Sequence, residues 1–274
     1  MENTFNDDVK DKALNHPDYL VRADNVKLIY DENLLSEILS SDPDFYVRQT
    51  ALANITSESI IERVAKTDID YYVRLAAVKK LTNNDILYEI ANNPEEDYFI
   101  CREAVLRMTS EEILLRIING DTDKDIKSAA IEKIENQEVL FDIARHAADF
   151  YVRTDAIRHI VDENKLAEIA CCDDDYYVRA IAVQHIKNDD MLYKVAINDS
   201  DYYVRKEAAL RITNNKYLYD IVQHDEDAYV RRTALENITD TAILKEISEK
   251  DEDRLLARIA RQMLKDASQE EDHA

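Results

Sequence analysis

Apolar and polar positions recur along the chain with a period of 26 residues. The string Asp-x-Tyr-Val-Arg marks the period, as in segments 44–48, 70–74, 149–153 and 201–205. We number each of the ten copies from the last residue of this string, position 0, and the spacing is 26 except for 27 between residues 74 and 101. The residues at position 0 are Arg22, Arg48, Arg74, Cys101, Lys127, Arg153, Arg179, Arg205, Arg231 and Ala257. A fixed period of this length is typical of repeat proteins built from one supersecondary unit.

Each copy predicts two short helices. Position −1 is aliphatic, position +3 is Ala in nine copies, and position +7 is Ile, Leu or Met, so the three lie on one face of a first helix. An Asp at position −4 in every copy suits the N-cap of that helix. Apolar residues at +12, +13 and +16, such as Ile86, Leu87 and Ile90, predict a second helix. Because helices of two or three turns are unstable alone, we expect them to pack as an α-solenoid.

The repeats predict one all-α domain with a cap at each end. About ten two-helix copies over residues 18–264 would form a curved superhelix. Residues 1–17 carry Val9, Ala13 and Leu14, which suit a degenerate helix covering the first copy. Residues 265–274 are a polar C-terminal tail that we expect to fray.

Composition supports the helical assignment and limits the partners. One Gly and three Pro among 274 residues are too few for the turns of a β-sandwich or barrel, and 46% apolar residues are too many for a disordered chain. The 35 basic and 58 acidic residues give a net charge of −23, which argues against nucleic acid and anionic membranes as partners.

The sequence favours a cytoplasmic location. Its N-terminal residues lack the pattern of a signal peptide, and no apolar window approaches the eighteen residues of a membrane span. The three cysteines form no C-x-x-C pattern, which argues against a disulfide framework or a zinc site. We therefore expect reduced thiols.

Asp followed by Val-Arg and then Ala, at the start of the first helix, resembles the HEAT-like repeat family. The similarity is to the branch that includes phycobilisome-lyase HEAT-like repeats and leucine-rich-variant repeats, and it covers nearly the whole chain. It implies a binding scaffold. Since 26 residues is short for a HEAT repeat, we expect the second helix to be partly 3₁₀.

The resemblance also implies a ladder in which Asp and Arg of adjacent repeats form charge-assisted hydrogen bonds. The Asp at −4 and the Arg at 0 are the candidates, whereas Cys101 and Lys127 interrupt the pattern and mark a possible softer joint. The predicted ladder residues are Asp44, Arg48, Asp70, Arg74, Asp149, Arg153, Asp175, Arg179, Asp201, Arg205, Asp227 and Arg231.

Position +6 carries a basic or titratable side chain in six successive copies. Such groups are favoured near a helix C-terminus by the helix dipole. They could instead form a positive stripe that binds an acidic segment of a partner, more strongly below about pH 6.5 because of the two histidines. This basic row consists of Lys80, Arg107, Lys133, His159, His185 and Arg211.

Pairs of aromatic residues stand at positions −3 and −2. Consecutive residues point about 100° apart on a helix, so we expect one ring of each pair to pack between repeats and the other to lie on the surface. Tyr is common at interfaces, although both rings could simply cover the seams between repeats. The candidate contact residues are Tyr72, Tyr151, Tyr177 and Tyr203.

No motif for catalysis is present, including the P-loop and the G-x-S-x-G and H-E-x-x-H patterns. Asp-x-Asp doublets such as Asp42/Asp44 are conceivable divalent-cation ligands, but they lack the Gly and distal Glu of an EF-hand loop. We expect no metal and no cofactor.

We therefore predict a non-catalytic protein–protein interaction scaffold that binds a partner, through an acidic segment of it, along the solenoid. One alternative is an accessory subunit of a chromophore lyase or other modifying enzyme, which needs a pocket with an acid or thiol inside it. A less favoured alternative is a HEAT-like nucleic-acid enzyme, which needs a basic face.

Overall fold

The computed structural model describes residues 2–271 and contains twenty α-helices and no strand within that range. Consecutive helices pack against each other in pairs, which confirms the all-α, two-helix repeat architecture. The chain divides into two compact units, Met1–Ile134 and Glu135–Ala274. Met1 and residues 272–274, which belong to the predicted cap and tail, lie outside the described residues.

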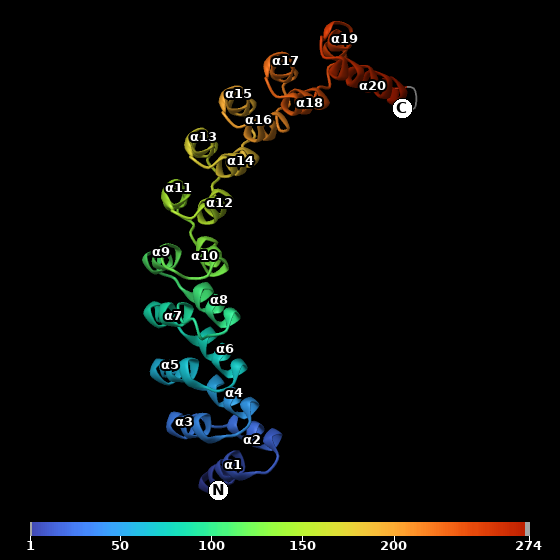
Figure 1. Ribbon diagram of the computed structural model, residues 1–274. Helices are drawn as coiled ribbons and strands as arrows, with labels where there is room; N and C mark the ends of the chain where they lie inside the picture. The colour runs from blue at the N-terminus through green and yellow to red at the C-terminus, as the bar shows by residue number, and fades with distance from the viewer. Residues whose placement is uncertain (1, 272–274) are drawn as a thin grey trace. The chain divides into compact units, whose positions relative to one another are not determined.

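In unit 1, which contains α1 to α10, the odd-numbered helices from α3 onward form one layer and the even-numbered helices form another (Figure 1). Each odd-numbered helix packs on the even-numbered helix that follows it, and each even-numbered helix also packs on the next one of its layer. The odd-numbered helices are α1 (Glu2–Asn15), α3 (Glu32–Ser41), α5 (Glu58–Thr67), α7 (Asn84–Ala91) and α9 (Glu111–Asn119). The even-numbered helices are α2 (Tyr19–Val26), α4 (Phe45–Ala53), α6 (Tyr71–Lys80), α8 (Tyr98–Arg107) and α10 (Lys124–Ile131).

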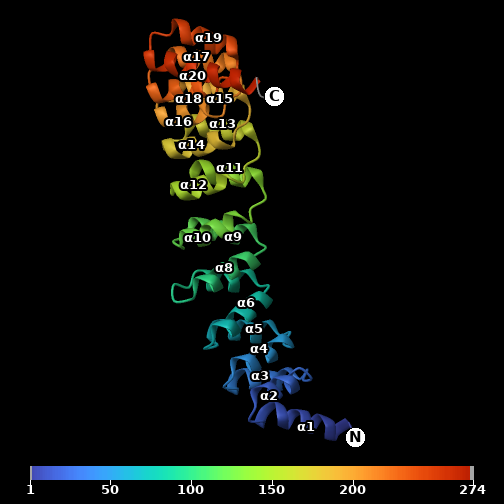
Figure 2. The ribbon, with the colours of Figure 1, turned by 90° about the vertical axis from the view of Figure 1, so that its right-hand side faces the viewer.

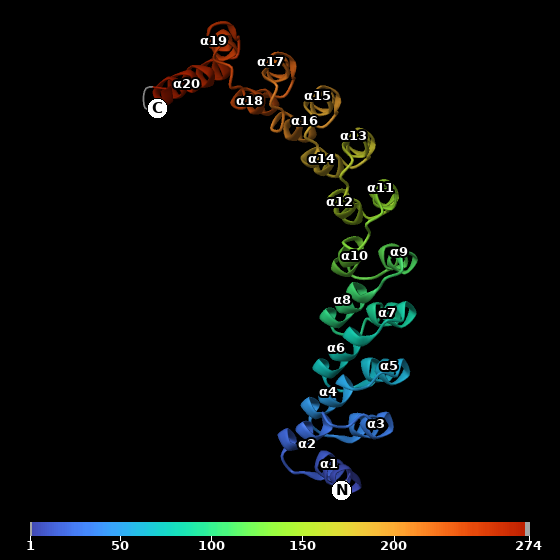
Figure 3. The same ribbon diagram turned by 180° about the vertical axis from the view of Figure 1, so that it is seen from behind.

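Unit 2 repeats this two-layered arrangement with α11 to α20, and Figures 2 and 3 show its helices from two further directions. Its odd-numbered helices are α11 (Gln137–His146), α13 (Glu163–Cys172), α15 (Asp189–Asn198), α17 (Asn215–His224) and α19 (Thr241–Lys250). Its even-numbered helices are α12 (Phe150–Ile157), α14 (Tyr176–His185), α16 (Tyr202–Ala209), α18 (Ala228–Glu236) and α20 (Arg254–Glu271).

The predicted apolar face forms the core of each unit. In copy three, Val73, Ala77 and Leu81 at positions −1, +3 and +7 are fully buried, and Leu87 of the odd-numbered helix is buried as well. The small Ala at +3 lets neighbouring even-numbered helices approach closely, as α4 and α6 do. The odd-numbered helices, which from α3 onward are the second helices of the copies, are regular α-helices of 8 to 14 residues. The expectation that the second helix is partly 3₁₀ is therefore wrong.

The ends of the chain continue the helical pattern. Helix α1 packs on α2 and buries Val9 and Ala13. Helix α20 runs on to Glu271, so the polar segment from residue 265 is helical as far as the structure describes it. Within residues 2–271, no helix combines the length and apolar character that a membrane crossing requires.

The aspartates at position −4 cap the even-numbered helices, as predicted. Oδ1 of Asp44 accepts the N–H of Tyr46 at 2.9 Å, and Oδ1 of Asp175 accepts the N–H of Tyr177 at 2.8 Å. Each bond satisfies a backbone donor that has no partner inside the helix.

We predict that Asp175→Ala lowers the free energy of unfolding by about 1 kcal/mol, because the first turn of α14 loses its cap. Asp175→Asn should be nearly neutral, since the Asn side chain can accept the same bond. Urea denaturation of the two variants checks this. Equal losses in both would show that the carboxylate charge, rather than the cap, stabilises the helix.

Candidate functional site

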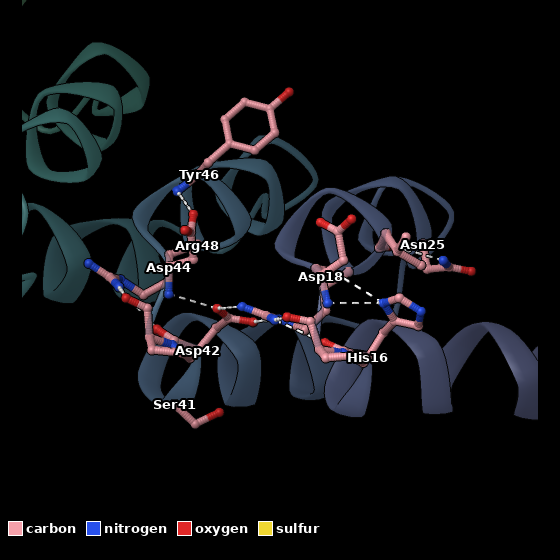
Figure 4. A network of polar contacts seen from close by, with 12 residues as sticks. His16, Asp18, Asn25, Ser41, Asp42, Asp44, Tyr46 and Arg48 are labelled. Carbon is pink, nitrogen blue, oxygen red and sulfur yellow. Dashed lines mark hydrogen bonds and ion pairs between the residues drawn. The ribbon is translucent and has the colours of Figure 1, made fainter.

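The arginines at position 0 form a ladder, but all except Arg231 pair with a different carboxylate from the one predicted. Arg22 joins copy one to copy two: Nε and Nη2 donate to the two oxygens of Asp42 at 2.7 and 2.9 Å, and Nη1 donates to the His16 carbonyl at 2.9 Å. Figure 4 shows Asp42 in this network, between His16 and Arg48. Asp42 lies at position −6 of copy two. The predicted partner, Asp44, caps α4 instead, and its own N–H donates to Asp42 at 2.8 Å.

The same geometry recurs in both units. Four further pairs are bidentate and largely buried: Arg48–Asp68, Arg153–Asp173, Arg179–Asp199 and Arg205–Asp225. Arg74 pairs with Glu96, in the loop that carries the extra residue. Arg231 pairs through a single 3.2 Å contact with Asp253, which stands at position −4 of copy ten, so this pair is the predicted one. The carboxylates at −4 face the N–H groups of their own helices, which corrects the pairing predicted for Asp44, Asp70, Asp149, Asp175, Asp201 and Asp227.

These contacts explain the Asp-x-Asp doublets. In doublets such as Asp42/Asp44, the first Asp accepts the ladder arginine and the second caps a helix, so both carboxylates have structural partners. Among the residues whose side chains the structure describes, no three or more His, Cys, Asp or Glu side chains are arranged to hold a metal ion.

Cys101 replaces the ladder arginine in copy four. It is 5% exposed, its Sγ lies 3.4 Å from the Ile90 carbonyl oxygen, and burial raises its pKa to about 11. The thiol is therefore neutral at ordinary pH and is not poised as a nucleophile. The ladder contact between copies five and six lacks both of its usual residues: Lys127 stands at position 0 of copy five, and Ala147 stands at position −6 of the following copy. The division between the two units falls within copy five.

A second network links adjacent copies through position +10, which the sequence reasoning missed. Oε1 of Glu32 accepts the N–H of Thr56 at 2.6 Å, its hydroxyl at 2.7 Å and the N–H of Ser57 at 3.0 Å. These donors lower the pKa of Glu32. Asp189 binds Thr213 and Asn214 in the same way. The recurrence of Glu, Asp or Asn at +10 before a Thr at +8 of the next copy was the available signal.

The basic row lies at the C-terminal ends of the even-numbered helices. Nζ of Lys80 donates to the carbonyls of Leu52, Ala53 and Ile55 at 2.8, 2.8 and 2.7 Å. These are the last carbonyls of α4 and the residues just after it, and they need donors because no residue in the described part of the chain adopts the positive φ of a glycine C-cap.

Other members of the basic row make similar contacts. Nζ of Lys133 donates to the Leu106 carbonyl at 2.7 Å, and Nε of Arg211 donates to the Ile186 carbonyl at 3.3 Å. Arg107 is exposed, whereas His159 and His185 are half-buried. Burial lowers the pKa of His185, and the nearby Arg158 and Arg211 lower it further. The contacts of Lys80, Lys133 and Arg211 agree with the helix-dipole explanation of this row.

The aromatic residues at −3 and −2 form an edge along the N-terminal ends of the even-numbered helices in each unit. At four places the ring at −3 of one copy contacts the ring at −2 of the next. Ring centroids lie 5.9 Å apart for Phe45 and Tyr72, and 6.2 Å apart for Tyr176 and Tyr203. The aromatic edge of unit 1 consists of Tyr19, Phe45, Tyr46, Tyr71, Tyr72, Tyr98 and Phe99. The aromatic edge of unit 2 consists of Phe150, Tyr151, Tyr176, Tyr177, Tyr202, Tyr203 and Tyr229.

Many of these rings are exposed. The exposed fraction is 58% for Tyr72, 39% for Tyr177 and 70% for Tyr229. Tyr151 is also exposed, whereas Tyr203 is half-buried. Both rings of a pair can be exposed, as Tyr176 and Tyr177 are, so the expectation of one ring in the seam and one on the surface is wrong for that pair. Figure 4 shows the Tyr46 ring pointing away from the ladder contacts.

One cavity of the ladder region, in unit 1, combines a thiol with acids. It has a volume of about 500 Å³ and is lined by Cys101, Glu96, Asp121 and Asp123, among others. Glu96 is paired with Arg74, and the Cys101 thiol is buried and neutral.

Neither a known protein family nor a curated protein matches this sequence. The resemblance to HEAT-like repeats therefore stays a prediction. The repeat architecture itself rests on the 26-residue pattern and on the packing described above.

We predict that Arg179→Ala lowers the free energy of unfolding by about 3 kcal/mol, because it leaves the Asp199 carboxylate buried without its partner. Arg179→Lys should recover only part of this loss, since an ammonium cannot make the bidentate contact. As a control, Arg232→Ala removes an exposed pair with Glu236 and should cost less than about 1 kcal/mol. Urea denaturation that gave equal losses for Arg179→Ala and Arg232→Ala would contradict a stabilising ladder.

We predict that His185 makes the protein less stable in mild acid. Because its pKa is lowered in the folded chain, the unfolded chain binds a proton first as the pH falls through about 6.5, so stability rises with pH across this window. The melting temperature of the His185→Asn variant should therefore fall less between pH 7.5 and pH 5.5 than that of the native chain. Identical pH dependence in the two proteins would rule out this role for His185.

Proposed function

We propose that the protein is a non-catalytic scaffold that binds a partner protein along the aromatic edge. The observation that carries the proposal is the row of exposed rings, repeated from copy to copy at positions −3 and −2. A tyrosine offers a large contact area with a polar tip and little side-chain entropy to lose, which makes it a common anchor at protein interfaces.

The aromatic edge is a better candidate surface than the basic row. Lys80 and Lys133 use their ammonium groups on backbone carbonyls, and withdrawing them would leave those carbonyls without these donors. The hypothesis of an acidic partner segment therefore loses two of its main contacts. The solvent-facing rings, in contrast, can bind a partner without disturbing a cap or a ladder contact.

The accessory-subunit alternative has one observation in its favour, the cavity beside Cys101. A thiol that holds a ligand there would have to be ionised and reachable. Cys101 is 5% exposed, and burial raises its pKa to about 11. We therefore favour the scaffold.

The test compares two triple variants in affinity capture from a host lysate. The edge variant replaces Tyr72, Tyr177 and Tyr229 with Ser. The control variant replaces Tyr30, Val161 and Leu210 with Ser, three exposed apolar residues at the opposite ends of the even-numbered helices. We expect the native chain and the control variant to capture the same partner protein. The edge variant should capture at least about tenfold less of it, since anchor tyrosines dominate such interfaces.

Circular dichroism must show equal helix content in all three proteins, so that lost binding cannot reflect unfolding. Retention by the edge variant would place the binding surface elsewhere. If the native chain retained no protein at all, the scaffold proposal itself would fail.

A further inference from the structure

We infer that the aromatic edge of unit 2 binds a cationic segment, and that arginine side chains of this segment stack on the tyrosine rings. The inference rests on the proposed function and adds the chemistry of the partner.

The first argument is the charge along the edge. Four segments form it: residues 148–151, 174–177, 200–203 and 226–229. Together they contain seven aromatic residues, six carboxylates and no Lys or Arg. The six carboxylates are Asp149, Asp174, Asp175, Asp201, Glu226 and Asp227.

Ring contacts hold the first three of these segments next to one another, and the packing of α16 on α18 joins the copies that carry the third and the fourth. The centroids of Phe150 and Tyr177 lie 6.3 Å apart, and those of Tyr176 and Tyr203 lie 6.2 Å apart, both in edge-to-face geometry. The carboxylates of the first three segments therefore lie along a continuous row of rings, and those of the fourth lie in the next copy. Asp174 is exposed, and the side chain of Glu226 is 86% exposed, although its Oε1 also lies 3.4 Å from Nη2 of Arg205. Such a surface attracts cations and repels acidic segments.

The chain's own contacts show that its aromatic rings accept cations. Nζ of Lys206 lies 5.3 Å from the ring centroid of Tyr203, a member of the edge. Away from the edge, the guanidinium carbon of Arg116 lies 4.0 Å from the ring centroid of Tyr88 in unit 1. Both distances are within the range of a cation–π contact. A partner cation would make the same kind of contact with edge rings other than Tyr203.

Arginine fits this surface better than lysine. A guanidinium is planar and weakly hydrated, so it can stack on a phenol ring while its N–H groups donate to a carboxylate beside the ring. Tyrosines next to carboxylates offer both contacts at once, as at Asp175 and Tyr177. A lysine ammonium makes only the electrostatic part of this interaction.

The repeat also sets the spacing of the partner's side chains. Packed helices lie about 8–10 Å apart, whereas an extended chain advances about 3.3 Å per residue. A cation at about every third residue would therefore meet one pair of rings after another. A twelve-residue peptide (Arg-Gly-Ser)₄ has this spacing and little structure of its own.

The test measures binding of this peptide to the purified full-length chain by fluorescence anisotropy, at low and physiological salt. The edge-charge variant combines Asp174→Asn, Asp201→Asn and Glu226→Gln. Asn keeps the cap of α16, so the fold should be preserved. The matched control combines Glu135→Gln, Asp240→Asn and Glu249→Gln, which removes the same charge from exposed positions off the edge and includes one cap, that of α19.

We expect the peptide to bind the native chain and the control about equally, and the edge-charge variant about tenfold more weakly, as three rim charges are removed. Equal weakening in the two variants would mean that only the net charge of −23 attracts the peptide, and would overturn the inference. No binding to the native chain would overturn it as well.

Two further comparisons test the stacking. Tyr177→Leu with Tyr229→Leu should weaken binding several-fold, whereas the corresponding Phe changes should keep it, because Phe retains the ring. A (Lys-Gly-Ser)₄ peptide should bind more weakly than the Arg peptide, and (Glu-Gly-Ser)₄ should not bind. Equal affinity for the Lys and Arg peptides would contradict guanidinium stacking.

The outcome separates the inference from the proposed function. If the Arg peptide fails while a lysate protein is still lost in the tyrosine edge variant, the edge is an interface and only its partner chemistry is wrong. If both tests fail, the edge is not a binding surface.

Discussion

The structure depends on how the ends of very short helices obtain hydrogen-bond partners. A helix leaves four N–H and four C=O groups without internal partners at its ends, which is a large share of the backbone when the helix has 8 to 10 residues, as most do here. The chain has one Gly, and no residue in its described part adopts positive φ, so glycine caps do not satisfy the carbonyls. Side chains serve both kinds of group: Asp44 accepts an N–H of its own helix, Glu32 accepts an N–H of the adjacent copy, and Lys80 donates to a carbonyl of the adjacent copy.

The arginine ladder extends the same solution to the loops. Arg179 donates through Nη1 to the carbonyls of its own loop and through Nε and Nη2 to Asp199 of the next copy. Asp199 in turn accepts the N–H of Asp201, which caps α16. One guanidinium therefore ties a loop, the adjacent loop and a helix cap together. Because the guanidinium binds both oxygens of the carboxylate in a fixed fork geometry, the ladder also constrains how adjacent copies stack.

The parts of this arrangement that are local in sequence could be predicted. The apolar face, the caps at −4 and the alternation of two helices follow from spacing alone, and the structure has all three. The partner of each arginine could not be predicted, because two aspartates two residues apart are chemically equivalent until the fold turns one toward the helix N–H groups. The sequence alone does not decide the role of the basic row either, because the role depends on contacts that only the fold creates. Its acceptors, such as the Leu52 carbonyl for Lys80, lie one copy away.

The internal use of polar positions decides what is left for binding. Side chains at −6, −4, 0, +6 and +10 bond within the repeat array, whereas the rings at −3 and −2 face solvent in many copies. In copy five the aromatic pair is replaced by Lys124 and Asp125, in the same copy that lacks the ladder arginine and contains the division between the units. The aromatic row therefore ends where the structural repeat is interrupted. Each unit carries its own edge, and a partner segment that follows one edge needs to match only the few copies of that unit.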